Sequence, residues 1–322
     1  MRSRILADTV KAALPDVAIA FVLSRQAPYA SECPYPTFLT EQSPTQCTAQ
    51  VNAILHEYRP SIAVFDGSGR AAQYRQAKRL GAQVLFISQH KKKRRRAFAF
   101  NRIRHIDAHC ITQFKFVDGD LTLGERLKLA LVGKPWPHFM GPIFSSPSET
   151  LPFETAEPYV VFSAGGGGHI VKGVQATNVF IEAANRWFAQ TGEQCHVLLG
   201  LNYQGAVDVA PGVLVHQQLP NAQLMALIKA ARVVVLGGGA ILPQAVALRT
   251  PSIAVAVAKD QPARIKAIAR AGLTVSCALD SGAICECLVQ TIPPPEVDLP
   301  VGRAIFISVF TDLIAKSVAS KV

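Results

Sequence analysis

The sequence predicts an α/β protein built from two doubly wound parallel-sheet domains, and three observations support this prediction. The chain has 322 residues, 49% of them hydrophobic, which suffices for two domains with cores of their own. Short apolar runs alternate with segments of helical periodicity, as in parallel sheets that helices cover on both faces. One stretch rich in Pro, Gly and Ser, 133–158, interrupts this series near its middle.

The N-terminal domain is expected to span 1–141. Its apolar spacing predicts helices at 1–14, 48–58 and 70–80, and strands at 17–23, 61–65 and 83–87. A doubly wound domain ordinarily begins with a strand and a glycine-rich turn, whereas this one begins with a helix. We therefore expect an N-terminal domain that lacks its first strand.

The C-terminal domain is expected at 159–300, after a linker at 142–158. Strands are predicted at 159–163, 196–199, 213–216, 233–236 and 252–257, with helices ending at 188, 230, 248 and 271. A proline-rich breaker, 293–295, precedes an amphipathic segment at 301–322. We expect this last segment to form a helix that packs back toward the N-terminal domain.

Composition excludes several classes of protein. No apolar stretch reaches the ~18 residues of a membrane span, and the start of the chain lacks the apolar block of a signal peptide. The seven cysteines are odd in number and form no CxxC pair, which favours reduced thiols in a cytoplasmic protein. The histidines have no metal-ligand spacing and no G-x-S-x-G turn occurs, so we expect neither a metal, nor a cofactor, nor triad hydrolysis.

The formal net charge of +11 is concentrated in one window. Residues 90–109 hold eight Lys or Arg against one Asp, a local charge of +7. The run consists of Lys91, Lys92, Lys93, Arg94, Arg95 and Arg96. It could bind an anionic acceptor or an anionic membrane surface, or it could be only a solvated basic loop. Nucleic acid is a less favoured partner, because the chain has no base-stacking motif.

Four glycines directly follow the predicted strand 159–163. In Ser163-Ala-Gly-Gly-Gly-Gly-His169 they let backbone N–H groups approach a ligand, and the expected helix start adds positive potential suited to a diphosphate. No Gly-Lys-Ser/Thr follows, so this is not a P-loop. The sequence favours phosphate binding over a merely structural turn.

A second glycine turn, 237–239, ends the predicted strand 233–236. Turns at the carboxyl ends of strands in one sheet share the crevice where such sheets bind ligands. Gln244 would present an amide there, and Asp260 and Gln261 end the next strand, placed either for sugar hydroxyls or for helix capping. Helix packing is the structural alternative for the turn itself.

The N-terminal counterpart is Asp66-Gly-Ser-Gly-Arg70. Asp66 could act as a base, with Ser68 and Arg70 beside an anionic acceptor; a capped turn explains the motif equally well. His90 also follows a strand, and we group it with Asp66 as a catalytic candidate.

With these motifs in view, the chain resembles the GT-B glycosyltransferase superfamily. The branch that it resembles contains the peptidoglycan N-acetylglucosaminyltransferase and the UDP-sugar hydrolase of pseudaminic acid synthesis. The resemblance is specific over about 110 residues of the C-terminal half, through 160–168, 219–231, 237–253 and 259–261. It implies two Rossmann-like domains facing a cleft, with a nucleotide-sugar bound by the C-terminal one. The donor-binding residues that it implies are Gly165, Gly166, Gly167, Gly168, His169, Leu219, Gly238, Gly239, Ala240, Gln244, Asp260 and Gln261.

Two departures from the family pattern matter. The family usually has Glu at the position of Gln244, where the side chain grips the ribose hydroxyls. Its N-terminal glycine loop, which carries a histidine, would precede Met1-Arg-Ser-Arg4, so we expect that histidine to lie upstream of residue 1.

The sequence thus predicts a metal-independent glycosyltransferase that takes a sugar from a nucleotide diphosphate sugar, UDP-linked in our expectation. Its acceptor would be anionic or presented by a membrane, with the protein cytoplasmic and in peripheral contact with the bilayer. The alternatives are a UDP-sugar hydrolase and a catalytically degenerate scaffold that acts as a basic binding protein.

Overall fold

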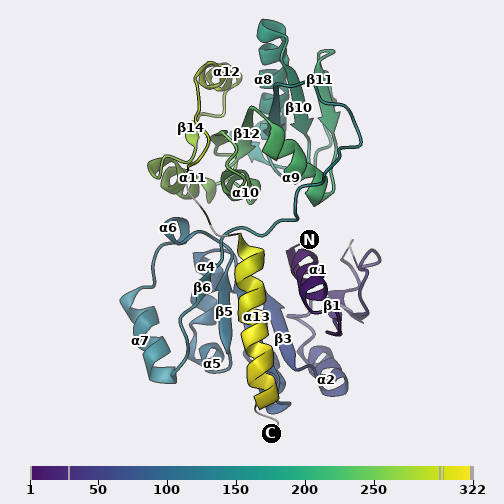
Figure 1. Cartoon of the computed structure of the whole chain (residues 1–322), viewed down its shortest axis with the longest axis vertical. Helices are drawn as coiled ribbons and strands as arrows, with labels where there is room; N and C mark the ends of the chain where they lie inside the picture. The colour runs from purple at the N-terminus through teal and green to yellow at the C-terminus, as the bar shows by residue number, and fades with distance from the viewer. Residues whose placement is uncertain (1, 28–29, 297–298, 300, 320–322) are drawn as a thin grey trace. The chain divides into compact units, whose positions relative to one another are not determined.

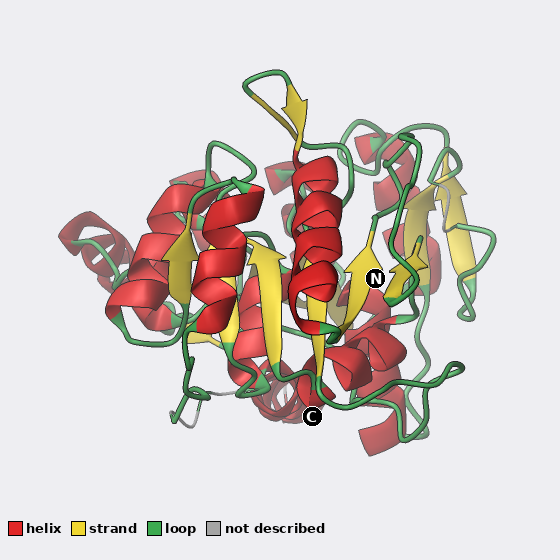
Figure 2. Ribbon diagram, turned by 90° about the horizontal axis from the view of Figure 1, so that it is seen from above, coloured by secondary structure: helices red, strands yellow, loops and turns green. Residues whose placement is uncertain are grey.

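The computed structural model describes residues 2–27, 30–296, 299 and 301–319. The chain divides into two compact units, 1–143 with 300–322, and 144–299. In each unit the main sheets are parallel, and helices lie on both sides of the strands (Figures 1 and 2). The predicted α/β class is confirmed. No helix in the described part of the chain combines the length and the apolar character needed to cross a membrane.

The first part of the N-terminal unit contains α1 (Arg2–Ala13), β1 (Phe21–Ser24), β2 (Thr37–Thr40), α2 (Thr48–Tyr58), β3 (Ile62–Asp66), α3 (Ala71–Arg79) and β4 (Gln83–Ser88). The unit continues with α4 (Lys91–Ala97), α5 (Phe100–Ile103), β5 (Ala108–Ile111), α6 (Lys115–Asp118), α7 (Leu123–Val132), β6 (His138–Phe139) and α13 (Gly302–Ala319). Sequence analysis did not identify β2, β5 or β6, and it placed β1 too early.

Strand β4 shows how the N-terminal core forms. Leu85 and Ile87 pack on one face with α1 and α13, and Val84 and Phe86 pack on the other face with α2 and α3. Successive side chains of a strand point to opposite faces, so a continuous apolar run indicates burial on both sides. The pattern of 83–87 was therefore informative.

The N-terminal strands form two separate sheets. Strands β1 and β2 pair in parallel, and a four-stranded parallel sheet has the order β3-β4-β5-β6. Val22 of β1 packs against the same core cluster as Ala63 of β3, yet in the described residues no strand joins β1 to β3. Val64, in the middle of β3, is 43% exposed.

The C-terminal unit begins with β7 (Tyr159–Ser163), β8 (Ile170–Val171), β9 (Val174–Gln175), α8 (Ala176–Thr191), β10 (Gln194–Leu198), β11 (Val213–His216) and α9 (Asn221–Ala230). It ends with β12 (Val233–Gly237), α10 (Ile241–Ala247), β13 (Ser252–Val255), α11 (Gln261–Arg270), β14 (Val275–Cys277) and α12 (Ser281–Val289). Six parallel strands form one sheet in the order β11-β10-β7-β12-β13-β14.

Candidate functional site

The strand order of the C-terminal sheet reverses between β7 and β12. From β7 the chain adds β10 and β11 on one side, then crosses over to add β12, β13 and β14 on the other. In open α/β sheets, ligands bind outside the carboxyl ends of the strands at such a switch point. Both glycine turns lie there: Ser163 pairs in register with Leu236, and a Cβ at Gly237 would lie 2.8 Å from the Ala164 carbonyl oxygen.

The loop Gly165–Gly168 requires glycine for two reasons. Gly165 and Gly167 have φ of 100° and 85°, a region that side chains disfavour. A Cβ at Gly167 would also lie 2.5 Å from the carbonyl oxygen of Leu199. The Gly165 N–H donates to Ser163 Oγ at 3.3 Å, but within the described part of the chain Gly166, Gly167 and Gly168 donate no hydrogen bond. Three N–H groups of this loop therefore have no acceptor among the described residues.

The segment after this loop differs from the prediction. Sequence analysis expected a helix directly after Gly168, whereas the hairpin β8–β9 intervenes and α8 begins at Ala176. Two hydrogen bonds still hold the start of α8 against the loop: Gln175 Nε2 donates to the Gly167 carbonyl at 3.1 Å, and Ala176 N–H donates to the His169 carbonyl at 2.9 Å. His169 itself is half-buried.

The second glycine turn has a clear packing role. A Cβ at Gly238 would lie 2.7 Å from the side chain of Ile265 in α11, so glycine permits that helix to approach the sheet. The Gly238 N–H donates to Gln261 Oε1 at 3.0 Å, and Val257 N–H donates to the same oxygen at 2.9 Å. Gln261 is buried, and its carbonyl oxygen holds these two backbone groups. The structure thus gives the Gln261 side-chain oxygen an internal role, and the contact of this residue with a sugar stays a prediction.

Arg264, which sequence reasoning missed, lies beside this turn. Its guanidinium donates to the Gly238 carbonyl and pairs with Asp260 Oδ2 at 3.3 Å, one helical turn earlier. The i, i+4 spacing of Asp260 and Arg264 was the sequence signal that could have indicated this ion pair. Asp260 makes no side-chain capping bond to α11, and its side chain is 75% exposed. It therefore remains open to a ligand.

The other predicted donor residues lie on neighbouring elements. Gly239 and the exposed Ala240 lead into α10, where Gln244 is half-buried. Leu219 is buried just before α9. These positions are compatible with the expected site at the carboxyl end of the sheet.

In the N-terminal unit, Asp66 ends β3 and is held by the start of α1. Arg2 donates from Nε to Asp66 Oδ2 at 3.2 Å and pairs with Oδ1 through Nη2, while Ser3 Oγ donates to Oδ2 at 2.6 Å. Arg2 Nη1 also donates to Thr112 Oγ1 at 3.0 Å, at the end of β5. Both carboxylate oxygens of Asp66 are thus engaged. This weakens its case as a catalytic base and favours a role in fixing α1.

The other candidate residues of the N-terminal unit lie after β3 and β4. Ser68 and Arg70 are exposed; Arg70 is the N-cap residue of α3, and its Nε donates to the Thr45 carbonyl at 2.8 Å. His90 is half-buried at the start of α4. Burial, followed by the Arg96 charge, lowers the pKa of Lys93, and Asp66 opposes that shift.

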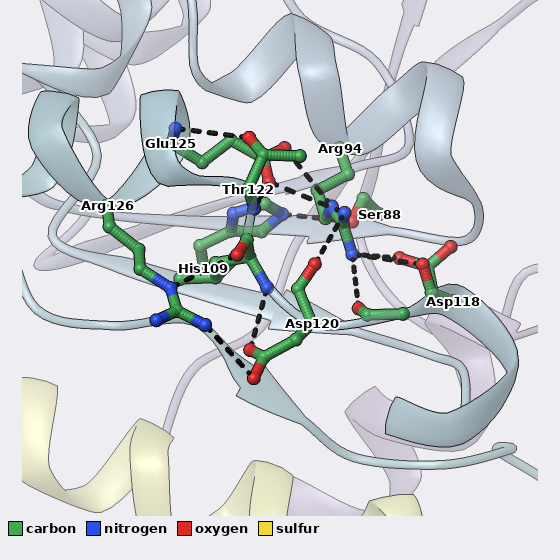
Figure 3. Close-up of polar contacts among 10 residues, drawn as sticks. Ser88, Arg94, His109, Asp118, Asp120, Thr122, Glu125 and Arg126 are labelled. Atoms are coloured by element: carbon green, nitrogen blue, oxygen red, sulfur yellow. Dashed lines mark hydrogen bonds and ion pairs between the residues drawn. The ribbon is translucent and has the colours of Figure 1, made fainter.

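The basic run forms a helix, α4, and one of its six cations points inward. Arg94 is 3% exposed; its Nη1 donates to Asp118 Oδ2 at 2.7 Å and its Nε to Glu125 Oε1 at 3.3 Å (Figure 3). Arg94 therefore does not belong to the predicted anion-binding surface, because two buried carboxylates from 118–125 neutralise it. Burial raises the pKa of Asp118 against the effect of Arg94. Lys91, Lys92, Arg95 and Arg96 are exposed, which suits an anion-binding surface and a solvated basic segment alike.

Comparison with known proteins identifies the fold. No protein-family profile and no curated protein sequence matches the chain. The glycosyltransferase of kitacinnamycin is similar in structure at 14% identity, with a TM-score of 0.62, over 98% of this chain and 91% of that one. UDP-GlcNAc 2-epimerase from Methanocaldococcus jannaschii has 11% identity and a TM-score of 0.63, over 97% and 96%. MurG from Acinetobacter baumannii has 13% identity and a TM-score of 0.54, over 97% and 86%. The chain thus has two Rossmann-like α/β domains, the fold of the GT-B glycosyltransferases.

Proposed function

We propose that this protein is a glycosyltransferase whose donor is a nucleotide diphosphate sugar, UDP-linked, bound by its C-terminal unit. The observation that carries the proposal is the loop Gly165–Gly168 at the switch point of the sheet, with three N–H groups that have no acceptor in the described structure. A diphosphate is an anion of the size and charge that such loops bind. Gln244, on α10, would accept hydrogen bonds from the ribose hydroxyls, and Asp260 would contact the sugar.

Structural neighbours support the nucleotide-sugar part of this proposal. Several are glycosyltransferases by name. One is a UDP-GlcNAc 2-epimerase from Neisseria meningitidis bound to UDP-GlcNAc, and another is S. aureus MnaA with UDP. A UDP-sugar is accordingly the first donor to test.

The loop would act chemically on the leaving group. As the bond from the sugar to the diphosphate breaks, negative charge grows on the diphosphate, and preorganised N–H donors stabilise that charge. The acceptor hydroxyl would attack the anomeric carbon and transfer its proton to a base. We place the acceptor on the N-terminal unit, near Ser68 and His90, with His90 as the candidate base.

Calorimetric titration with UDP tests the donor site. In Gly166→Ala the new Cβ would meet only Asn202 Nδ2 at 3.6 Å, an ordinary contact, so the fold is retained while a methyl group occupies the phosphate approach. We expect at least about tenfold weaker UDP binding. Gly124→Ala, whose Cβ meets nothing within 4 Å, is the matched control and should bind as the parent does. Equal affinities for the parent and G166A would contradict the placement of the diphosphate.

Product analysis with a radiolabelled UDP-sugar distinguishes the possible reactions. Transfer predicts labelled acceptor only when an acceptor extract is present. Free labelled sugar without acceptor would instead establish a hydrolase. Appearance of the C2 epimer of the donor would establish the chemistry that the epimerase neighbours are named for. Absence of UDP binding and turnover would leave a basic binding protein on a degenerate scaffold.

A further inference from the structure

One helix of the N-terminal unit exposes a stripe of leucines. Leu123, Leu127 and Leu131 of α7 are spaced by four residues, and 74%, 56% and 75% of their surfaces are exposed. Side chains at this spacing lie one above the other along a helix. The opposite face of α7 carries the buried Leu129 and Glu125. The leucines therefore form an apolar outer face that the unit itself does not cover.

Aromatic and cationic side chains flank this stripe on both sides. Lys128 Nζ lies 5.4 Å from the ring centre of Phe100, and the Arg126 guanidinium lies 5.4 Å from that of Trp136. Phe100 and Trp136 are 52% and 55% exposed. We call the leucine stripe with these four residues the α7 patch. Figure 1 shows α5, α6 and α7 together on one side of the N-terminal unit.

The charge around the α7 patch is strongly positive. Residues 91–136 hold twelve Lys or Arg and four Asp or Glu, a local charge of +8 out of the total of +11. All four acids are engaged. Asp118 and Glu125 pair with Arg94, Asp107 pairs with Lys78 and Lys134, and Asp120 pairs with Lys115 and Arg126. The surface thus offers cations whose charge no neighbouring carboxylate in the described structure neutralises.

The buried Arg94 network fixes the basic helix to the leucine helix. Arg94 of α4 reaches Glu125 of α7, whose Oε2 also accepts the Thr122 N–H at 2.9 Å, while Thr122 Oγ1 accepts the Glu125 N–H (Figure 3). Lys91 lies beside Gly119, between α6 and α7, where its Nζ would be 3.4 Å from an added Cβ. This buried network therefore holds α4, with its exposed cations, and α7, with its exposed leucines, in a fixed arrangement within one unit.

We propose that the α7 patch docks on the surface of a membrane that contains anionic lipids. Leu side chains on one face of a helix, Trp and Phe beside them and Lys and Arg around them are the composition of helices that lie in the headgroup region. Anionic lipids attract each nearby Lys or Arg. A second copy of the chain is a poorer occupant, because a two-fold contact would oppose the positive surface to itself. This inference does not depend on the proposed function, since it concerns neither the glycine loop nor the donor.

Sedimentation with vesicles tests the proposal. The full chain is mixed with vesicles of phosphatidylcholine alone or of phosphatidylcholine with phosphatidylglycerol. We expect binding to the mixed vesicles that weakens with salt, and little binding to the neutral ones. Combined Leu123→Ser, Leu127→Ser and Leu131→Ser should reduce partitioning at least about tenfold. Leu201→Ser, at a leucine that is 68% exposed in the C-terminal unit, is the matched control.

Charge variants distinguish docking through the α7 patch and the neighbouring α4 cations from a general attraction of a basic protein to anionic lipid. Lys91→Gln with Lys92→Gln should weaken binding more than Lys229→Gln with Lys266→Gln, which remove the same charge from exposed positions of the C-terminal unit. Circular dichroism and UDP titration on each variant confirm that fold and donor binding are unchanged. Vesicle binding that the leucine variant retains in full would overturn the proposal. Binding of the parent to nucleic acid but not to vesicles would overturn it as well. A change of oligomeric state in the leucine variant, measured by light scattering, would instead assign the patch to a contact between copies.

Discussion

Buried histidines make the folded state sensitive to acid. Burial lowers the pKa of His196 to about 4 and that of His109 to about 3. His196 Nδ1 lies 3.0 Å from His216 Nε2, and His109 Nε2 lies 2.9 Å from Ser88 Oγ, so both rings are held as neutral hydrogen-bonding groups. At neutral pH neither ring carries a charge that the interior would have to accommodate.

We therefore predict that the free energy of unfolding falls as the pH is lowered from about 6.5 toward 4. The unfolded chain binds protons on these histidines near pH 6.5, whereas the folded chain resists until about pH 4, so acid favours unfolding. Urea unfolding at pH 7, 5.5 and 4.5 measures the loss, which we expect to be at least about 1 kcal/mol. His196→Gln should flatten this dependence and the exposed His56→Gln should not. Identical slopes for the two variants would refute the assignment.

Arg94 illustrates why a single buried cation matters more than its exposed neighbours. Arg94→Met would leave Asp118 and Glu125 buried without their partner, and we expect a loss of about 3–5 kcal/mol in unfolding free energy. Arg95→Met, at an exposed position of the same helix, should change stability by less than about 0.5 kcal/mol. Adding Asp118→Asn and Glu125→Gln to R94M should restore part of the loss. Denaturant titration compares the three proteins, and equal stabilities for R94M and R95M would contradict the burial of Arg94.

Gln244 bears on the strength of donor binding. If its amide oxygen accepts hydrogen bonds from the ribose hydroxyls as proposed, a carboxylate at that position would make charge-assisted hydrogen bonds. Such bonds are roughly twice as strong as neutral ones. Gln244→Glu should therefore bind UDP several-fold more tightly in calorimetry, and Gln244→Ala more weakly. Unchanged affinity in both variants would remove Gln244 from the donor site.

At the scale of elements, the divided N-terminal sheet has a measurable consequence. Strand β3 pairs with β4 on one side only in the described residues, whereas β4 lies between β3 and β5. Val64 of β3 is 43% exposed, while Val84 of β4 is fully buried. An edge strand keeps part of its backbone and side-chain surface in contact with water. Val64 and Val84, one on each strand, should thus differ sharply in their contribution to stability.

We predict that Val64→Thr costs less than about 0.5 kcal/mol and that Val84→Thr costs about 2 kcal/mol, because only the second buries a hydroxyl without a partner. Chemical denaturation measures both. Amide hydrogen exchange should also be faster in β3 than in β4. Equal costs would mean that β3 is covered in solution by something that the described residues do not include.

At the scale of the whole molecule, much of the architecture was predictable because it depends on local pattern. Continuous apolar runs indicated strands buried on both faces, and two glycine turns indicated where two of those strands end. The hairpin β8–β9 was missed because two-residue strands carry too little periodicity to detect. Strand β5 was missed because His109 and Cys110 interrupt an apolar pattern next to the basic run.

By itself, the sequence determined the α/β class, the glycine loop and the concentration of positive charge in one window, since these follow from residue type and spacing. Only the tertiary structure decided which charged side chains are exposed and which are buried and paired. Arg94 is buried because carboxylates 24 and 31 residues further along the chain pair with it. Asp66 is hydrogen-bonded because the start of α1 lies against the end of β3. The same packing exposes the leucines of α7. Burial depends on which distant segments meet, and local periodicity does not encode those meetings.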